Sequence, residues 1–566
     1  MSRSSRHFTL AVLLLIILLG LILPGESIQA QETDPAALIV GIVKDPQAQP
    51  VVDAKVVLVN EGENDPVSEA TTQADGRYAL VLPGAIPKTL SLHIERSHFQ
   101  DYSLRLSPNE IVKLGAGETI VLQEVTLQRQ ISPAFWVATL VFVLVLALIA
   151  TGIIHNTLAA LVGITVLFGV SYLGPMLTDG LFIFDFTSSM RYIDWNVIFL
   201  IMGMMIVIAV FENTGIFQWL AFFAYRISGG RTWLLLPILM LITGIASAFL
   251  DNVTTMLLMT PITVQISLAL GINPLALLIP EVMASNVIGV STLVGTPTNI
   301  LIGSYGNISF NDFLMNLTPG VLMAFVGLLV YSFLVYRREL EAAHDASPLL
   351  MEKLAERGQI AEPEQLKKAA AVFAGMLVLF VIGEHFHMLP AVTALMGATV
   401  LLIWIKPDIE EMIDAVDWTT LVFFMSLFIV VGGIQEVGLI SIIADVISRI
   451  VGDSLLLAML AVTWLSALLS MVIANIPFTA AMLPVIAFLT ATIPGADSKV
   501  LFFCLSVGAA MGGNGSLIGA SANMVTAGIS EAAGYPITYS YFIKKGFPAL
   551  LITVALAMVW LLIRFL

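Results

Sequence analysis

The chain contains almost no cysteine and few charged residues. Cys504 is the single cysteine among 566 residues, which excludes an intrachain disulfide and a cysteine-based metal cluster. Charged residues make up 11% of the chain, whereas roughly a quarter of a soluble domain is charged. The formal net charge is −15, and this acidic balance argues against nucleic acid as a partner. These shortages exclude both an ordinary soluble protein and a disulfide-rich one.

Hydrophobic residues are abundant instead, at 58% of the chain. From about residue 133 onward, apolar runs recur with the ~20 residues that a helix needs to cross a bilayer. We therefore predict an all-α polytopic membrane protein in the lipid bilayer of the cytoplasmic membrane. The sequence shows no nucleophile–base pair, phosphate-binding loop or metal-ligand cluster, so we expect neither an enzyme nor a cofactor.

The first 30 residues have the pattern of a targeting segment. Arg3 and Arg6 precede an apolar run over 8–23, and small residues lead to Ala30. A secretory signal peptide has its regions in this order, so we predict a signal peptide over 1–30. The length of the apolar run leaves an uncleaved anchor helix as the alternative.

A soluble domain follows at 33–128. Short runs rich in β-branched residues alternate with turn signals such as Asp75-Gly76, which predicts a small β-sandwich. The stretches Gly41–Val43, Pro50–Val56 and Thr72–Tyr78 resemble the carboxypeptidase-regulatory-like domains. Because the domain follows the signal segment, we expect it to be extracytoplasmic.

The membrane part divides into two halves joined by a polar linker. We place the first half at 133–336, the linker at 337–368 and the second half at 369–566. The linker contains several Lys and Arg residues, so the positive-inside rule predicts that it is cytoplasmic. With the sandwich outside, the first half must cross the membrane an odd number of times. The two halves then have opposite orientations, as an inverted repeat requires.

The two halves share a sequence pattern. Asp251-Asn252-Val253-Thr254-Thr255 returns as Ala474-Asn475-Ile476-Pro477, at an offset of 223 residues. Gly295-Thr296-Pro297-Thr298-Asn299 returns as Gly519-Ala520-Ser521-Ala522-Asn523, at an offset of 224. Polar breaks at matching places in two apolar halves are typical of a transporter's binding site. They predict a re-entrant hairpin and a broken helix in each half, because unwound backbone in a membrane must line a cavity or be buried in protein.

The candidate substrate- and ion-binding residues lie in these breaks. They are Asp251, Asn252, Thr254, Thr255, Gly295, Thr296, Pro297, Thr298, Asn299, Asn475, Thr479, Gly519, Ser521 and Asn523. Side-chain donors and the N–H groups at the start of a half-helix can hold an anion, and unwound carbonyl oxygens can hold Na⁺. We expect no metal other than Na⁺.

Two carboxyl groups are candidates for proton or ion coupling. Asp251 would place a negative charge at the hairpin tip, which suits cation binding or proton exchange because burial favours the neutral form of a carboxyl group. Glu281 lies in an apolar segment without Lys or Arg, and an ionisable group inside a membrane needs a partner, an ion or a cavity. We expect Na⁺ or H⁺ as the coupling ion.

These motifs, together with Asp194-Trp195 and Ser285-Asn286, resemble the ion transporter superfamily. Within it they are most similar to the citrate-transporter-like branch of arsenite permeases, NhaD-type Na⁺/H⁺ antiporters and the melanosomal P protein. The resemblance covers the chain after residue 133 and implies an elevator-type transporter, a homodimer, driven by Na⁺ or H⁺. The divalent-anion/Na⁺ symporters of the superfamily have Ser-Asn-Thr at the hairpin tips. This chain keeps only Asn252 and Asn475 of those signatures, which weakens the case for a dicarboxylate.

The first functional hypothesis is ion-coupled secondary active transport of a small anion or oxyanion. Two other transport hypotheses stay open. One is Na⁺/H⁺ antiport that uses Asp251, and the other is an arsenite-type permease. A hypothesis from another class is a sensor whose outer sandwich binds a ligand and signals through a degenerate membrane domain. The intact paired motifs argue against such degeneracy.

Overall fold

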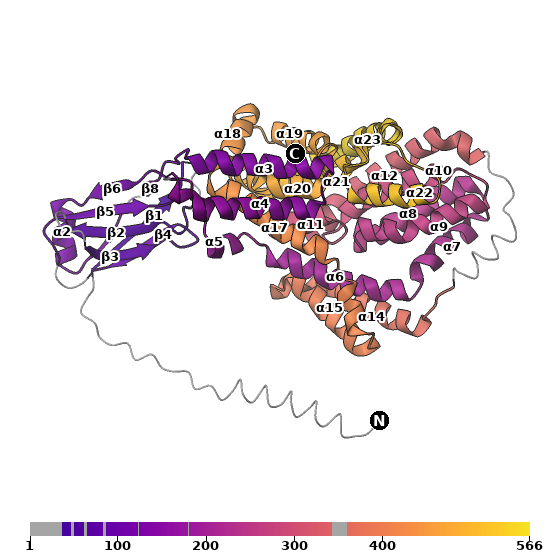
Figure 1. Cartoon of the computed structure of the whole chain (residues 1–566), viewed down its shortest axis with the longest axis horizontal. Helices are drawn as coiled ribbons and strands as arrows, with labels where there is room; N and C mark the ends of the chain where they lie inside the picture. Colours follow the sequence, from indigo (N-terminus) through magenta and orange to yellow (C-terminus); the bar gives the residue numbers. More distant parts are fainter. Residues whose placement is uncertain are drawn as a thin grey trace, which may run out of the picture. The chain divides into compact units, whose positions relative to one another are not determined.

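The chain folds into two compact units, 1–130 and 131–566 (Figure 1). The computed structural model describes residues 37–46, 50–60, 65–82, 86–122, 124–178, 180–341 and 359–566. The predicted signal peptide and the linker residues 342–358 therefore lie outside the described residues.

The first unit is a β-sandwich of two four-stranded sheets. One sheet has the order β4–β1–β7 with β8 paired to β1, and the other has the order β3–β2–β5–β6. The elements are β1 (Leu38–Lys44), β2 (Lys55–Asn60), β3 (Pro66–Thr71), β4 (Arg77–Val81), β5 (Leu90–Glu95), β6 (Tyr102–Arg105), α2 (Pro108–Gly115), β7 (Thr119–Val121) and β8 (Val125–Thr126). More and less buried residues alternate along β1 and β5, so the inward faces of both sheets form one core. The predicted sandwich is confirmed.

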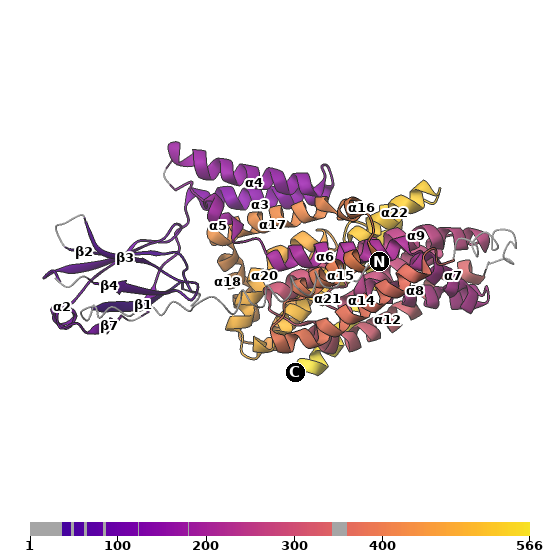
Figure 2. The same cartoon turned by 90° about the horizontal axis from the view of Figure 1, so that it is seen from below.

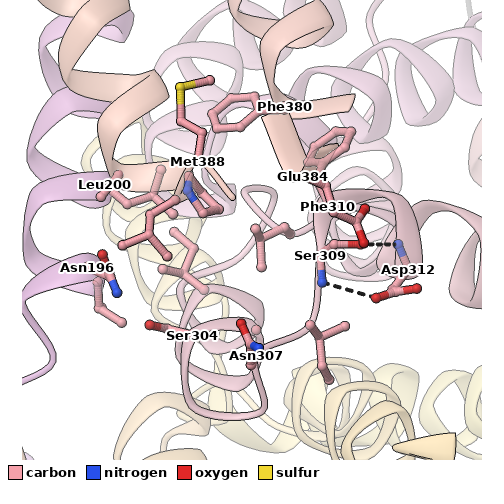
Figure 3. A pocket seen from close by; sticks show the side chains of 18 of the residues that line it. Asn196, Leu200, Ser304, Asn307, Ser309, Phe310, Asp312, Phe380, Glu384 and Met388 are labelled. Atoms are coloured by element: carbon pink, nitrogen blue, oxygen red, sulfur yellow. Dashed lines mark hydrogen bonds between the residues drawn. The ribbon is translucent and has the colours of Figure 1, made fainter. Parts of the chain in front are cut away.

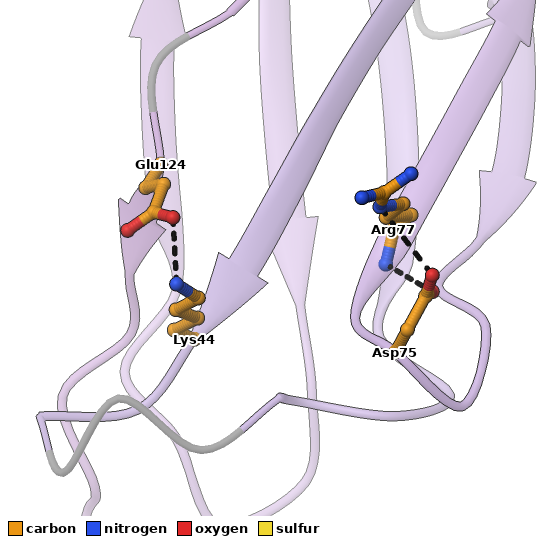
Figure 4. Close-up of polar contacts among 4 residues, drawn as sticks. All are labelled: Lys44, Asp75, Arg77 and Glu124. Carbon is orange, nitrogen blue, oxygen red and sulfur yellow. Dashed lines mark hydrogen bonds and ion pairs between the residues drawn. The ribbon is translucent and has the colours of Figure 1, made fainter.

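Ion pairs lie on the surface of the sandwich. Lys44 Nζ is 2.6 Å from Glu124 Oε1, and Arg77 Nε is 3.4 Å from Asp75 Oδ2 (Figure 4). Because water reaches these side chains, such pairs contribute about 0–1 kcal/mol each to stability. The apolar core therefore holds the sandwich together.

Tyr78 is packed against a glycine in that core. Its side chain is 3% exposed, and its hydroxyl group has no hydrogen-bond partner among the described residues. A Cβ atom at Gly41 would lie 2.5 Å from this hydroxyl oxygen, so the glycine leaves the space that the ring occupies. Burial raises the pKa of Tyr78 to about 12.

The second unit is helical, and ten of its described helices are long and apolar enough to cross a membrane. The first half contains α3 (Pro133–Thr151), α4 (Asn156–Leu173), α5 (Phe186–Met190), α6 (Trp195–Asn213), α7 (Ile216–Ser228), α8 (Thr232–Phe249), α9 (Asn252–Ala269), α10 (Leu275–Ile288), α11 (Pro297–Tyr305) and α12 (Phe310–Glu341). The second half contains α14 (Pro363–Ile382), α15 (Pro390–Ile405), α16 (Ile409–Asp414), α17 (Trp418–Glu436), α18 (Leu439–Val451), α19 (Leu455–Ser470), α20 (Asn475–Thr492), α21 (Val500–Gly512), α22 (Ser521–Ala532) and α23 (Tyr539–Phe565). The predicted all-α polytopic membrane protein is confirmed.

The helices of the two halves correspond one to one. Helices α6 and α17 both have 19 residues, α7 and α18 both have 13, and α9 and α20 both have 18. An aspartate caps the start of α6 and of α17, namely Asp194 and Asp417. The sequence repeat is therefore also a structural repeat.

Corresponding helices run in opposite directions. The end of α6 and the start of α17 meet, because Glu212 and Asp417 line one cavity. The start of α6 and the end of α17 also meet, because the Tyr192 hydroxyl donates a hydrogen bond to Glu436. Helix α6 finishes at the end of the unit that we call the linker end. The name reflects Ala361, just before α14, whose N–H donates to the Thr214 carbonyl there. The other end is called the opposite end.

Each half contains one helical hairpin and one broken helix, as the sequence pattern predicts, and Figure 2 shows the arms of the first hairpin, α8 and α9, close to one another. Only residues 250–251 separate α8 from α9, and residues 471–474 separate α19 from α20. A 3₁₀ turn and an extended segment interrupt the chain between α10 and α11, and the same interruption lies between α21 and α22. The hairpin of each half packs against the broken helix of the other, with α9 on α22 and α20 on α11.

Candidate functional site

The tip of the first hairpin is closed by its own aspartate. Asp251 Oδ1 accepts the N–H groups of Val253 at 2.8 Å and Thr254 at 3.0 Å, and Asp251 Oδ2 accepts the Thr254 hydroxyl at 2.6 Å. Asp251 is thus the N-cap of α9. Aspartate is common at this position because the carboxylate accepts hydrogen bonds from the N–H groups of the first helical turn. Its negative charge also balances the positive end of the helix dipole.

The second hairpin lacks this cap. Helix α20 begins after Ala474 and α22 begins after Ala520, and neither alanine can cap a helix with its side chain. In the first half, α11 is capped by Thr296, whose hydroxyl accepts the N–H of Asn299 at 3.2 Å. The half-helices of the first repeat are therefore capped by their own side chains, whereas those of the second repeat are not.

Glycines allow the broken helices to fold back on themselves. A Cβ atom at Gly295 would lie 2.4 Å from the carbonyl oxygen of Gly289, and one at Gly519 would lie 2.8 Å from that of Gly513. Real Cβ atoms do not approach so closely, so both turns require glycine. The motif glycines therefore shape the backbone of the site.

The paired asparagines of the broken helices hold the unwound backbone. Asn299 Nδ2 donates to the carbonyls of Val290 and Thr292 at 3.0 and 2.7 Å. Asn523 Nδ2 donates to the carbonyls of Gly513 and Ser516 at 2.8 and 2.9 Å. Both side chains are fully buried, and backbone groups in a membrane need such partners. Their amide groups position the site rather than face an open cavity.

A hydrogen-bond network of carboxamides joins the two half-sites. Asn252 Nδ2 donates to Asn286 Oδ1 at 2.8 Å, and Asn286 Nδ2 donates to Asn514 Oδ1 at 2.9 Å and Asn523 Oδ1 at 3.0 Å. From the second repeat, Ser506 Oγ donates to the Asn299 side chain at 2.6 Å. Our candidate residues did not include Asn286, Asn514 and Ser506. In the sequence, Asn286 appears in the Ser285-Asn286 motif of the resemblance, whereas Asn514 and Ser506 stand out only as polar residues in an otherwise apolar segment.

A cavity of about 420 Å³ reaches the first hairpin tip from the linker end. Four candidate residues line it, namely Asp251, Thr254, Pro297 and Ser521. Three of its lining side chains are carboxylates, from Glu212 on α6, Asp251, and Asp417 before α17. Among its described lining residues there is no Lys, Arg or His. We call this space the aspartate cavity.

The other candidate residues do not line the aspartate cavity. They are Asn252, Thr255, Gly295, Thr296, Thr298, Asn299, Asn475, Thr479, Gly519 and Asn523, and all are buried behind it. The structure thus brings the two hairpin tips and the two broken helices together, while it turns most of their side chains inward. Glu281 is buried on α10 and is not among the cavity's lining residues.

A smaller cavity at the opposite end corresponds to the aspartate cavity through the repeat. It measures about 300 Å³ and contains Asp194 and Gln435, the equivalents of Asp417 and Glu212. Along the second hairpin it is lined by Ala480, not by Asn475 at the tip. The cavity at the linker end therefore reaches the first hairpin tip, whereas the equivalent cavity at the opposite end is smaller and is not lined by the second hairpin tip.

A third cavity, of about 680 Å³, lies at the opposite end between α6, the α11–α12 connection and the loop before α15. Figure 3 shows Asn196, Asn307 and Glu384 around it, with Ser309 and Asp312 hydrogen-bonded to each other. None of our candidate residues is among its described lining residues. Ile300 lines both this cavity and the aspartate cavity, so apolar side chains separate the two spaces.

Comparison with known proteins agrees with this architecture. The profile of the Citrate transporter family matches residues 142–508. A 46 kDa membrane protein of Mycobacterium leprae is 35% identical over 431 residues, which cover 76% of this chain and 99% of that protein. The human P protein is 32% identical over 507 residues, covering 75% of this chain and 59% of that protein. A Synechocystis protein named as an uncharacterized transporter is 31% identical over 446 residues, covering 75% of this chain and 96% of that protein.

These matches confirm the resemblance of the membrane part to the branch that includes the P protein. They do not bear on the carboxypeptidase-regulatory-like character of the sandwich, which stays a prediction. The chain belongs to the Citrate transporter family and is a membrane transporter.

Proposed function

We propose that the protein is a secondary active transporter that exchanges a cation such as Na⁺ for H⁺, with Asp251 as the shared binding group. The position of Asp251 in a cavity with two further carboxylates and no described cationic side chain carries this proposal. Such a cavity has a negative potential, which attracts cations and repels free anions. Of the hypotheses from the sequence, the geometry therefore favours antiport.

The chemistry of Asp251 suits an exchange reaction. Its oxygens accept three hydrogen bonds, and a carboxylate has about four acceptor positions, so capacity remains for one ion. Hard cations prefer oxygen ligands, and the neighbouring Thr254 hydroxyl can supply another. A proton and a Na⁺ compete for the same carboxylate, so release of one allows binding of the other.

The repeat supports alternating access by an elevator-type movement. With the predicted cytoplasmic linker, the aspartate cavity faces the cytoplasm and this conformation is inward-facing. The smaller equivalent cavity at the opposite end marks where access would open after the movement. In this scheme the hairpins and broken helices move together against α6 and α17. Both helices line the aspartate cavity, and α17 and the residues just before α6 line the smaller one.

Cation-coupled symport of a small anion is the second candidate function. The uncapped half-helices α20 and α22 favour it, because the helix dipole and the N–H groups at such ends can bind an anion. Ile476, the second residue of α20, and Ser521, the first residue of α22, line the aspartate cavity, and the family itself is described as a citrate transporter family. A cation on Asp251 would then neutralise the site for the anion. No contact in the cavity favours an arsenite-type permease.

The test uses purified protein in liposomes that contain a pH-sensitive dye. A Na⁺ gradient is imposed without any added organic anion, and wild type is compared with Asp251→Asn. Asparagine caps helices as well as aspartate does, so the variant removes the charge and keeps the fold. Asp408→Asn is the matched control, because Asp408 is an exposed N-cap on α16 outside the cavity.

Antiport predicts Na⁺-driven proton movement in wild type and in Asp408→Asn, and none in Asp251→Asn. Sodium uptake that requires citrate or another anion, without proton movement, would favour symport instead. Equal proton fluxes in wild type and Asp251→Asn would refute the assigned role of Asp251.

A further inference from the structure

Glu281 is a buried carboxyl group that the proposed exchange at Asp251 does not use. It is 0% exposed on α10. The Thr243 hydroxyl on α8 donates to Glu281 Oε1 at 2.6 Å. Thr263 approaches the carboxyl group from α9, yet neither Glu281 Oε2 nor Thr263 Oγ1 has a hydrogen-bond partner among the described residues. Two buried oxygen atoms, on the neighbouring helices α10 and α9, thus lack hydrogen-bond partners.

No charged group compensates a carboxylate at this position. The helices packed against α10 are α8, α9, α12, α21, α22 and α23. Their ionisable side chains are Asp312, Tyr331, Tyr336, Arg337, Arg338, Glu339, Glu341, Cys504, Glu531, Tyr539, Tyr541, Lys544, Lys545 and Arg564. In the described part of the chain, Glu281 has no salt bridge with any of these groups, and its only hydrogen bond is the one from Thr243. An isolated buried charge is strongly unfavourable, so such a group takes up a proton or a counter-ion.

A proton is the simplest way to remove this buried charge. Protonation of Glu281 Oε2 makes the group neutral, and the Thr243 hydroxyl continues to donate to the other carboxyl oxygen. A protonated Glu281 thus needs no counter-ion among the described residues.

The second repeat contains no counterpart of this group. The equivalents of Glu281 and Thr263 are Leu505 and Ile486, and both are buried in the core. The fold therefore packs equally well with apolar side chains at these places. A purely structural role does not account for an acid that occurs only in the repeat that contains Asp251.

Hydroxyl groups continue from Glu281 toward the hairpin tip. One helical turn further along both helices, Ser285 Oγ donates to Ser247 Oγ at 2.9 Å. Ser247 follows Thr243 by one helical turn on the same face of α8, and Asp251 lies four residues further on, beyond the end of α8 at Phe249. This pair places polar groups between α8 and α10, on the side of Glu281 toward the hairpin tip.

We propose that Glu281 is a second, occluded proton-binding site of the transporter, loaded with a proton in this conformation. The inference rests on the proposed cation/proton exchange and deepens it. The proton stays on Glu281 while Na⁺ and H⁺ compete at Asp251, and it leaves through Ser285 and Ser247 when the hairpin changes sides. Each cycle of net Na⁺/H⁺ exchange then moves the proton of Glu281 in addition to the ion exchanged at Asp251, whereas exchange of Na⁺ for Na⁺ leaves that proton in place.

The first test measures the proton itself. Infrared spectra of the purified full chain are recorded during a pH titration, in wild type, Glu281→Gln, Asp251→Asn and Glu531→Gln. We expect a protonated-carboxyl C=O band at neutral pH that is present in wild type and Glu531→Gln and lost in Glu281→Gln. Absence of the band in wild type, or its persistence in Glu281→Gln, would overturn the proposal. This measurement does not depend on which ion is transported.

The second test uses liposomes and ²²Na⁺. Glutamine mimics the protonated acid, so Glu281→Gln should keep Na⁺/Na⁺ exchange and move fewer protons per Na⁺ than wild type when uptake is driven by a pH gradient. A wild-type number of protons per Na⁺ in Glu281→Gln would contradict the proposal. Asp251→Asn tests the exchange mechanism separately. This variant should lose both Na⁺/Na⁺ exchange and the Na⁺ uptake driven by the pH gradient, while it keeps the infrared band of Glu281.

Discussion

Asn286 is the residue whose loss should most weaken the connection between the two repeats. It is 1% exposed and makes three side-chain hydrogen bonds, to Asn252, Asn514 and Asn523. Interhelical hydrogen bonds in membrane proteins contribute about 0.6 kcal/mol on average and at most about 1.7. Asn286→Ala should therefore destabilise the protein by about 2–5 kcal/mol. Asn252→Ala loses only one of these bonds and should cost about 0.6–1.7 kcal/mol.

The single cysteine provides the assay. Cys504 is fully buried on α21, so a maleimide dye that fluoresces on reaction reports unfolding of the membrane unit without engineered labels. Thermal midpoints should fall in the order wild type, Asn252→Ala, Asn286→Ala. Asn213→Ala is the control, because this residue is exposed at the end of α6 and surface substitutions change stability by less than about 0.5 kcal/mol.

A midpoint of Asn286→Ala equal to that of Asn213→Ala would refute this reasoning. It would mean that water or rearranged side chains replace the three bonds without loss. A fall in Asn286→Ala no larger than in Asn252→Ala would mean that the bonds to the second repeat contribute nothing.

Three further predictions concern single positions. Ala474→Asn gives α20 a side-chain cap and should raise stability by about 0.5–2 kcal/mol, so a lower midpoint in the thiol assay would contradict the assigned helix start. Gly295→Ala should unfold the broken helix, because its Cβ atom would lie 2.4 Å from a backbone oxygen, whereas Gly528→Ala meets nothing within 4 Å and should stabilise α22 by about 0.5–1 kcal/mol. In the sandwich, burial raises the pKa of Tyr78 from 10.0 to about 12, so between these values the unfolded chain has lost the proton that the folded chain keeps. Stability should therefore fall by about 1.4 kcal/mol per pH unit in that window. Denaturant titrations of wild type and Tyr78→Phe check this, because the variant should lack the slope.

The positions of the breaks could be predicted from the sequence, because the repeat makes each one visible twice. Asp251 and Ser521 were found in this way, and both line the cavity. The direction of the side chains could not be predicted. In Gly-Thr-Pro-Thr-Asn, nothing in the sequence distinguishes an asparagine that faces an ion from one that binds its own unwound carbonyls, as Asn299 does.

The difference in helix capping between the two repeats could be predicted in part from the sequence. Aspartate against alanine at positions 251 and 474 predicts one capped and one uncapped helix. The role of Asn286 was hidden, because its partners Asn514 and Asn523 lie more than 200 residues away in the chain. The depth of each cavity depends on the conformation, which no sequence pattern specifies.

The crossed packing of the repeats has a consequence for the energetics of transport. Each hairpin packs against the broken helix of the other repeat, and Asn286 bonds the first hairpin tip to the broken helix of the second repeat. In the proposed elevator-type movement the site is therefore carried as one rigid body, without a change in the distances between its ligands. Such a site would have the same intrinsic affinity for its ion on both sides of the membrane. The electrochemical gradients alone would then set the direction of transport, and reversing them should reverse the flux.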